Sequence, residues 1–261
     1  MPFQDLDSLR LFQFATFNKL PLKHAVFTRR GGRSQGPYAE LNVGATVGDD
    51  PDRVRQNLEL AFTALGRPRA SMFDSWLVHG TQHLVADAPR PPDWERPPQA
   101  DIVMTNKPEV SLFMRYADCL PLLLYDAEHR AIALAHAGWK GTVLKVAAAA
   151  LEAMRAEYGT RPEDVHAAIG PGISADHYEI GPEVIEAVEG AFGADAADLL
   201  PRVNGSTHFD LPAANALSLR QSGVQHVEDA EICTASNTQD WFSHRAEKGR
   251  TGRFGVLLAL N

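Results

Sequence analysis

Four apolar runs follow one another between residues 101 and 137, with no helical pattern among them. They are DIVMTN (101–106), VSLFMRYA (110–117), LPLLLYD (120–126) and AIALAHA (131–137). Short, nearly continuous apolar runs are typical of strands that are buried on both faces. Because four such runs occur without an intervening helix, the segment predicts a mixed sheet and argues against a doubly wound fold.

The rest of the chain mixes strand and helix patterns without strict alternation. Further strand-like runs lie at 24–30, 74–80, 166–170 and 253–260. Helical patterns lie at 50–66, from about 142 to 159, at 182–193 and at 210–223, with Asp50 and Asp210 as expected N-caps. We therefore expect one α+β domain over residues 1–261, with mixed β-sheets in a sandwich-like core and flanking helices. The five prolines of 88–99 predict a surface loop inside this domain in preference to a domain linker.

The composition narrows the classes of partner. A net charge of −8 over 261 residues argues against binding to nucleic acid or to anionic membranes, which select basic surfaces. It remains compatible with a small basic pocket for one anion. No apolar run approaches the roughly 20 residues that span a bilayer, and the N-terminus lacks the features of a signal peptide. Two cysteines are too few for a disulfide framework, so we expect a reduced, cytoplasmic protein. The oligomeric state stays open.

Cys119 has three alternative roles in this chain: a small core residue, a nucleophile or a metal ligand. It stands at a break between two apolar runs, beside Asp118, and His136 ends the next run. An antiparallel return could bring His136 back beside Cys119. His79 ends the run 74–80, so two histidines and one cysteine could form a three-ligand site with an open fourth position, as in catalytic zinc sites. His83 follows four residues after His79, and we interpret it as an accessory or solvated residue.

Two segments could bind an anion. In FTRRGGRSQGPYAELNVG (27–44), arginines bracket Gly31 and Gly32, and glycine turns with arginine forks are typical of phosphate binding. A solvated surface loop is the alternative. Near the C-terminus, a turn-rich segment carries Arg245, Lys248, Arg250 and Arg253 ahead of the final apolar run. It is either a basic rim or a solvated loop. No dinucleotide-binding or Walker motif is present.

Several motifs together resemble a known family. They are FTRRGGRSQGPYAELNVGATVGDDPDRVRQN, VHG, ADCLPLLLYD, AHAGWKGT, IGPGIS, YEIG, FDL and the C-terminal CT, FSHR and GRTGR, and they extend over nearly all of 25–261. The chain is similar to the multicopper polyphenol oxidase, or laccase-like, domain family. Members of that family are also described as zinc-dependent purine nucleoside phosphorylases with adenosine deaminase activity. The combination of ADCLP with HAGWKG is highly specific.

The resemblance implies that His79, Cys119 and His136 are metal ligands. Three positions depart from the family pattern: Leu77 replaces a glutamine, Lys140 replaces an arginine, and Gly172 replaces a cysteine. None of them removes an implied ligand. Leu77 puts in doubt any hydrogen bond that the glutamine makes beside His79, and Lys140 keeps the charge but loses the planar fork of arginine.

The resemblance also implies a reaction. Zn²⁺ would support deamination of adenosine, with Glu179 as a weak candidate for proton transfer. Phosphorolysis of adenosine, inosine or methylthioadenosine needs a phosphate site, for which we nominate Arg29 with the backbone of Gly31 and Gly32. Further candidates for the pocket are Asn42, Lys140, Arg245 and Arg253. The alternatives are a metal-free Cys119–His136 hydrolase, including one that edits peptidoglycan precursors, a copper-dependent polyphenol oxidase (Cu²⁺ in place of zinc), and a non-catalytic binding module.

Overall fold

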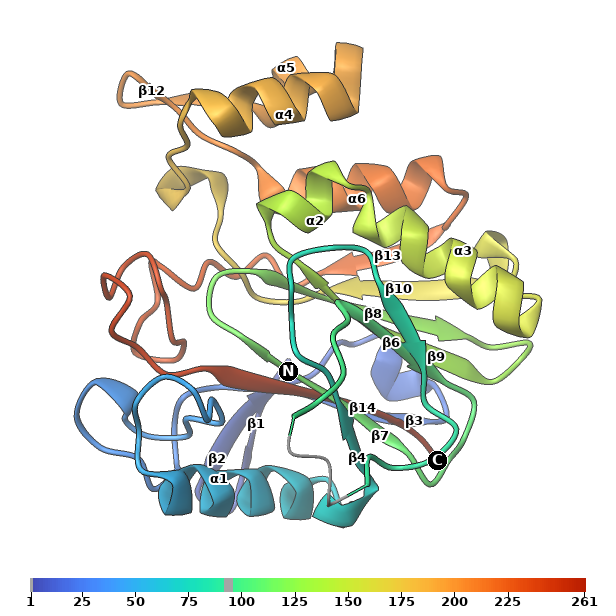
Figure 1. Ribbon diagram of the computed structural model, residues 1–261, viewed down its shortest axis with the longest axis vertical. Helices are drawn as coiled ribbons and strands as arrows, with labels where there is room; N and C mark the ends of the chain where they lie inside the picture. Colours follow the sequence, from blue (N-terminus) through green and yellow to red (C-terminus); the bar gives the residue numbers. More distant parts are fainter. Residues whose placement is uncertain (1, 92–95) are drawn as a thin grey trace.

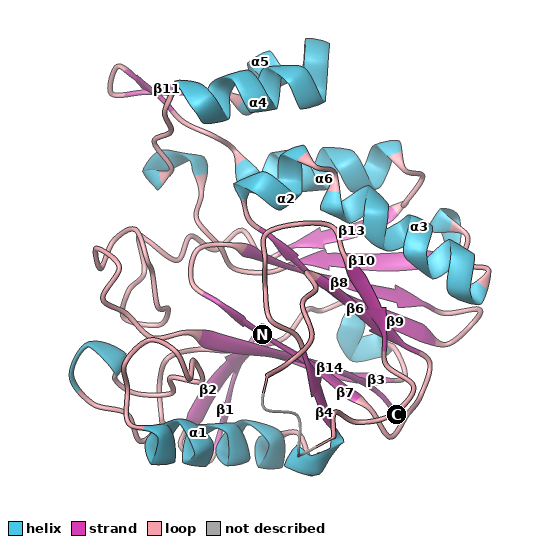
Figure 2. Cartoon of the chain, viewed as in Figure 1, coloured by secondary structure: helices cyan, strands magenta, loops and turns pink. Residues whose placement is uncertain are grey.

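The described residues, 2–91 and 96–261 of this computed structural model, form two six-stranded sheets that face each other, with helices on the outer faces (Figures 1 and 2). The first sheet contains, in spatial order, β1 (Phe3–Leu6), β2 (Leu9–Phe12), β3 (Leu22–Phe27), β14 (Phe254–Leu260), β7 (Ser111–Tyr116) and β4 (Met72–Asp74). The second contains β13 (His226–Asp229), β10 (Val165–Ile169), β8 (Leu120–Asp126), β9 (Ala131–Ala137), β6 (Ile102–Thr105) and β5 (His83–Val85).

Most neighbouring strands pair antiparallel, but β4–β7, β5–β6 and β10–β13 pair parallel, so both sheets are mixed. Helix α1 (Pro51–Ala64) covers the first sheet. The second sheet is covered by α2 (Trp139–Val143), α3 (Val146–Tyr158) and α6 (Leu211–Gln221) (Figure 1). Helices α4 (Pro182–Phe192) and α5 (Ala196–Leu199) and the hairpin β11 (Arg202–Val203) and β12 (Ser206–Thr207) lie beyond them. This confirms the expected α+β domain with a sandwich-like core and flanking helices.

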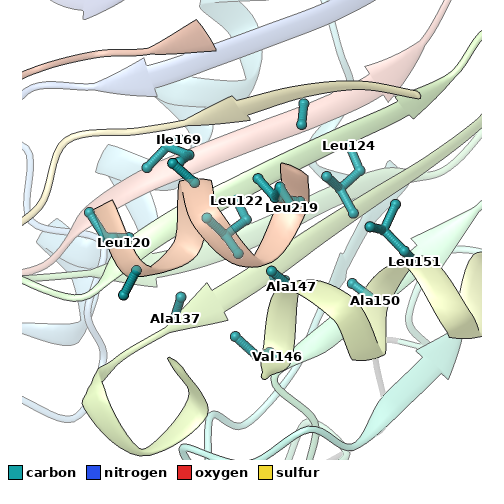
Figure 3. Packing of buried hydrophobic residues seen from close by; sticks show 14 of the residues in the cluster. Leu120, Leu122, Leu124, Ala137, Val146, Ala147, Ala150, Leu151, Ile169 and Leu219 are labelled. Atoms are coloured by element: carbon teal, nitrogen blue, oxygen red, sulfur yellow. The ribbon is translucent and has the colours of Figure 1, made fainter. Parts of the chain in front are cut away.

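Alternation along the buried strands divides the core into layers. Every residue of β8 and β9 is buried. Leu122 and Leu124 of β8 face the helices, whereas Leu123 and Tyr125 face the other sheet. In β9 the helix-facing positions are all alanine, which lets Ala147 and Ala150 of α3 and neighbouring side chains pack closely onto the strand (Figure 3). The continuous apolar runs of the sequence therefore reflect strands buried on both faces.

Two predicted elements need correction. The run 74–80 is not a strand beyond Asp74: Trp76 makes only an isolated bridge to Gln99, and the φ angle of 60° at His79 is incompatible with a strand. The helix expected from about 142 to 159 is two helices, because Lys145 adopts the left-handed conformation between α2 and α3.

Other predicted features have the expected structure. The side chains of Asp50 and Asp210 cap their helices as predicted. In the proline-rich segment 88–99, residues 92–95 lie outside the described residues, and the described remainder is loop apart from the Gln99 bridge. Among the described residues, no helix combines the length and the apolar character that crossing a membrane requires.

Candidate metal centre and cavity

Three segments bring His79, Cys119 and His136 together. Cys119 follows β7 in the short turn that leads into β8, and His136 lies on β9 opposite Pro121 in the antiparallel β8–β9 register. His79 comes from the loop after β4. One donor atom from each side chain lies within 4.8 Å of the other two. Within residues 2–91 and 96–261, this is the only group of three or more His, Cys, Asp or Glu residues placed in this way.

Asp101 contacts two of these three residues, at the backbone of His79 and the side chain of His136. Its carboxylate is fully buried and accepts hydrogen bonds from the backbone N–H groups of Val78, His79 and Gly80 at 3.2, 3.0 and 2.8 Å. Its Oδ1 also lies 2.9 Å from Nδ1 of His136. If Nδ1 carries the proton in this contact, Nε2 of His136 is left as the atom that can bind a metal.

The electrostatics of the group favour a thiolate. Burial by itself raises the pKa of Cys119, but the charge of His136 and hydrogen bonds from His136 and His79 outweigh it and lower the pKa to about 6. Burial also opposes the charged form of His136, yet Cys119 and Asp101 raise its pKa to about 9. Without a metal, these contacts favour a thiolate–imidazolium pair.

Gly138 leaves the space that these side chains occupy. A Cβ atom at this position would lie 2.9 Å from Sγ of Cys119 and 3.2 Å from Cδ2 of His79. Gly138 is also the N-cap of α2, so the first turn of this helix begins directly at the site. This close approach gives a physical reason for glycine in the AHAGWKGT motif.

Asp118 has a structural role beside Cys119. Its buried carboxylate accepts hydrogen bonds from the hydroxyl groups of Thr234 and Ser243 and from the backbone N–H of Arg245, at 2.6–2.7 Å. These bonds fasten the C-terminal segment to the turn that holds Cys119. Asp118 therefore stands beside Cys119 because it attaches the C-terminal segment to this turn.

His79, Cys119 and His136 are the candidate metal ligands and together form the metal-ligand group. They open into a cavity of about 850 Å³, within the size range of small-molecule sites. The three proposed ligands contribute to its lining. Its aromatic lining residues are Trp76, Trp139 and Tyr178, and its arginines are Arg69, Arg90, Arg115, Arg245 and Arg253. Among the described residues, only two carboxylates, Asp74 and Asp118, belong to the lining. The cavity is therefore rich in positive charge although the whole chain is acidic.

Of the five residues nominated for phosphate, Arg245 and Arg253 line this cavity, and Arg29 does not. The Arg29 guanidinium is committed to the carbonyl groups of Ala39 and Thr238, to the Glu247 carboxylate at 3.0 Å, and to the ring of Phe242.

The glycines beside Arg29 also have internal contacts. The N–H of Gly31 donates to the carboxylate of Glu40, and a Cβ atom at Gly31 would lie 1.8 Å from the carbonyl oxygen of Ser8. The two glycines thus allow a close approach of backbone segments.

The other nominated residues also lie outside the lining. Asn42 is buried and accepts the N–H of Arg253 at 2.8 Å, so it positions the start of β14. Lys140 is exposed, with its ammonium group 5.4 Å from the ring of Trp139. Glu179 likewise is not part of the lining, whereas its neighbour Tyr178 is. Leu77, which replaces the glutamine of the family pattern, lines the cavity with an apolar side chain.

Sequence reasoning missed Asp101, Gly138, Asp74 and Arg115. Asp101 begins a buried apolar run and Arg115 interrupts another, and a charge inside such a run indicates either pairing or function. That signal was present in both cases. Asp74 carries the same signal, because it begins the predicted run 74–80. Gly138 stands in the AHAGWKGT motif, but its close approach to Cys119 and His79 depends on contacts between segments that are distant in the sequence.

Comparisons with known proteins agree with the sequence motifs. The model of the multi-copper polyphenol oxidoreductase laccase family matches residues 23–261. A purine nucleoside phosphorylase of Deinococcus radiodurans is 39% identical, over 92% of this chain and 90% of the relative. One from Bacteroides thetaiotaomicron is 35% identical, over 91% of this chain and 92% of the relative. The crystal structure of YlmD from Geobacillus stearothermophilus has a TM-score of 0.92 at 26% identity and covers 100% of this chain and 99% of that chain. The chain therefore belongs to the multi-copper polyphenol oxidoreductase laccase family.

Proposed function

We propose that the protein is a zinc-dependent purine nucleoside phosphorylase acting on adenosine, inosine or methylthioadenosine, with adenosine deaminase activity as a second reaction. The observation that carries the proposal is a His₂Cys group that opens into a cavity lined by five arginines. The names of the similar proteins from Deinococcus radiodurans and Bacteroides thetaiotaomicron support the phosphorylase part.

The donor set fits zinc. Two imidazoles and one thiolate are ligands that zinc commonly takes, and three protein ligands leave one position open, as in catalytic zinc sites. Asp101 orients His136 in the way that carboxylates orient metal-binding histidines. His79, Cys119 and His136 would hold the ion, and the ion would supply Lewis acidity to the cavity.

The residues of the chain would bind and orient the phosphate and the nucleoside. In phosphorolysis, a phosphate oxygen forms a bond to the anomeric carbon of ribose while the bond to the purine nitrogen breaks. The arginines of the cavity would stabilise the phosphate charge. The faces of Trp76, Trp139 and Tyr178 offer apolar, aromatic area for a purine. For deamination, no proton carrier is assigned, because Glu179 does not line the cavity.

The test is release of hypoxanthine from inosine, and of adenine from adenosine, with and without phosphate. We expect release to depend on phosphate and to be lost in Cys119→Ala and His136→Ala, with about one zinc per chain in the wild type. Equal release in phosphate-free buffer would contradict phosphorolysis. Ammonia released from adenosine without phosphate measures the deaminase reaction separately.

A metal-free Cys–His hydrolase, with peptidoglycan-precursor editing as one example, is the second candidate. The thiolate-favouring contact of Cys119 with His136 supports it. Full activity in protein without zinc, abolished by stoichiometric alkylation of Cys119, would establish this alternative. A copper-dependent polyphenol oxidase has weaker support. A His₂Cys group can bind copper, but a multicopper cluster needs more histidine ligands than the described residues bring together here.

A further inference from the structure

One end of the cavity is formed by the first sheet. Strands β4, β7 and β14 are neighbours there, and α1 covers their outer face (Figure 1). Asp74 ends β4, Arg115 lies on β7, and Arg253 directly precedes β14. All three residues line the cavity.

A buried carboxylate fixes one of these arginines. The Asp74 side chain is only 2% exposed, and its two oxygens accept from Nε of Arg90 at 2.6 Å and from Nη1 of Arg115 at 2.8 Å. Nε of Arg115 donates to the carbonyl group of Val43 at 2.8 Å. These two bonds hold the guanidinium plane of Arg115, while its Nη2 has no hydrogen-bond partner among the described residues.

Val43, which accepts from Arg115, also contacts Arg253. The N–H of Val43 donates to the carbonyl group of Arg253 at 3.0 Å, and Nη1 of Arg253 donates to the carbonyl groups of Thr251 and Gly252. Among residues 2–91 and 96–261, no carboxylate pairs with Arg253, and its Nε and Nη2 have no partner. Burying a guanidinium that has no directly paired carboxylate is costly, and an anionic ligand would offset that cost.

Arg253 also connects this end of the cavity to the metal-ligand group. Burial lowers its pKa, and the negative charges of Cys119 and Asp118 act in the opposite direction. Those charges are therefore close enough to affect Arg253. An anion beside Arg253 would lie in the same cavity as a nucleoside at the three proposed ligands.

We propose that Arg115 and Arg253, with Arg115 oriented by Asp74, form the subsite for inorganic phosphate. Two fixed guanidinium groups with free N–H donors match the oxygens of a tetrahedral dianion, which arginine binds in a bidentate manner. The choice of free phosphate as the ligand rests on the proposed phosphorylase function. The arginine subsite itself rests on the contacts above.

The experiment measures phosphate binding directly, by calorimetry on the zinc-loaded protein, next to the KM values for phosphate and inosine. We expect Arg253→Met and Arg115→Met each to weaken phosphate binding by about tenfold to a hundredfold, the effect of losing one charged hydrogen-bond pair. The KM for inosine and the zinc content should change little. Arg115→Lys and Arg253→Lys should recover only part of the affinity, because lysine keeps the charge without the fork.

The control is Arg55→Met, which removes an exposed arginine of α1 that is paired with Asp52 outside the cavity and should leave phosphate binding unchanged. Arg115→Met also removes a partner of Asp74, so Arg253→Met, which leaves that pair intact, is the decisive variant. Circular dichroism and zinc content show whether each variant is folded. Unchanged phosphate affinity in folded Arg253→Met and Arg115→Lys would overturn the subsite.

Two further outcomes separate the subsite from the proposed function. If phosphate binds in an Arg253-dependent way but inosine is not cleaved, the subsite stands and the phosphorylase function fails. If cleavage depends on phosphate but its affinity is unchanged in the variants, the function stands and the subsite is wrong. Binding of adenosine 5′-phosphate but not inorganic phosphate, lost in the same variants, would overturn the assignment to free phosphate.

Discussion

At the scale of single residues, Gly138 allows a sharp test of the metal-ligand group. Its φ and ψ of −83° and 176° are open to alanine, so Gly138→Ala should fold. The new methyl group would stand 2.9 Å from Sγ of Cys119 and displace the thiol or His79. We expect zinc affinity, measured by competition with a chelator, to fall by about tenfold or more, as when metal-site orientation is disturbed.

Gly181→Ala is a matched control. Gly181 is the N-cap of α4 and has almost the same backbone angles, −91° and 174°, but a Cβ atom there would meet nothing within 4 Å. Both variants lose one glycine at a helix N-cap, so a difference between them reports the crowding at Cys119. Equal zinc affinity in the two variants would show that the site accommodates a side chain at 138.

The thiolate character of Cys119 gives a prediction on pH. In metal-free protein, alkylation by iodoacetamide should rise as pH increases through about 6, since the thiolate is the reactive form and the pKa of Cys119 is lowered to about 6. An ordinary cysteine titrates near 8.5. Mass spectrometry of the peptides separates Cys119 from Cys233. A midpoint near 8.5 for Cys119 would contradict the proposed influence of His136, and His136→Ala should move the midpoint upward.

At the scale of elements, the sequence predicted best where one periodic signal decides the structure. The four runs between 101 and 137 became β6, β7, β8 and β9, since continuous burial leaves a strong apolar pattern. Strands β1 and β2 escaped prediction because they are short, and β1 is partly exposed. The run 74–80 resembled a strand. The backbone N–H groups of Val78, His79 and Gly80, however, bond to the side chain of Asp101 and not to a neighbouring strand.

The candidate site, too, could be predicted only where its residues lie on elements that are adjacent in the sequence. The proximity of Cys119 and His136 follows from an antiparallel return between adjacent strands, which the sequence order suggests. Arg29 stands in a motif that is typical of phosphate binding, yet its partners come from residues 39, 238 and 247. Arg115 belongs to the cavity because β4 and β14 flank β7. Contacts across such distances in the chain leave no local pattern.

At the scale of the whole molecule, we expect the stability of the fold to depend little on the proposed metal. Three clusters of buried apolar side chains lie between the two sheets and under the helices on each outer face. Removing zinc therefore should leave the fold intact, unlike in small zinc-dependent domains. The proposed ligands would still add stability, because zinc would bind the folded chain in preference to the unfolded one.

The size of this effect can be predicted. Zinc at a hundredfold excess over its Kd adds about 2.7 kcal/mol, which for a chain of this length raises Tm by about 5–10 °C. The rise should shrink as pH falls below about 9, because protonation of His136 competes with zinc, and shrink further below about 6, where Cys119 is also protonated. Thermal unfolding followed by circular dichroism, with zinc or chelator at pH 8 and pH 5, measures both effects. The Tm of Cys119→Ala should rise much less on addition of zinc at pH 8. Loss of cooperative unfolding on chelation would instead show that the metal is required for folding.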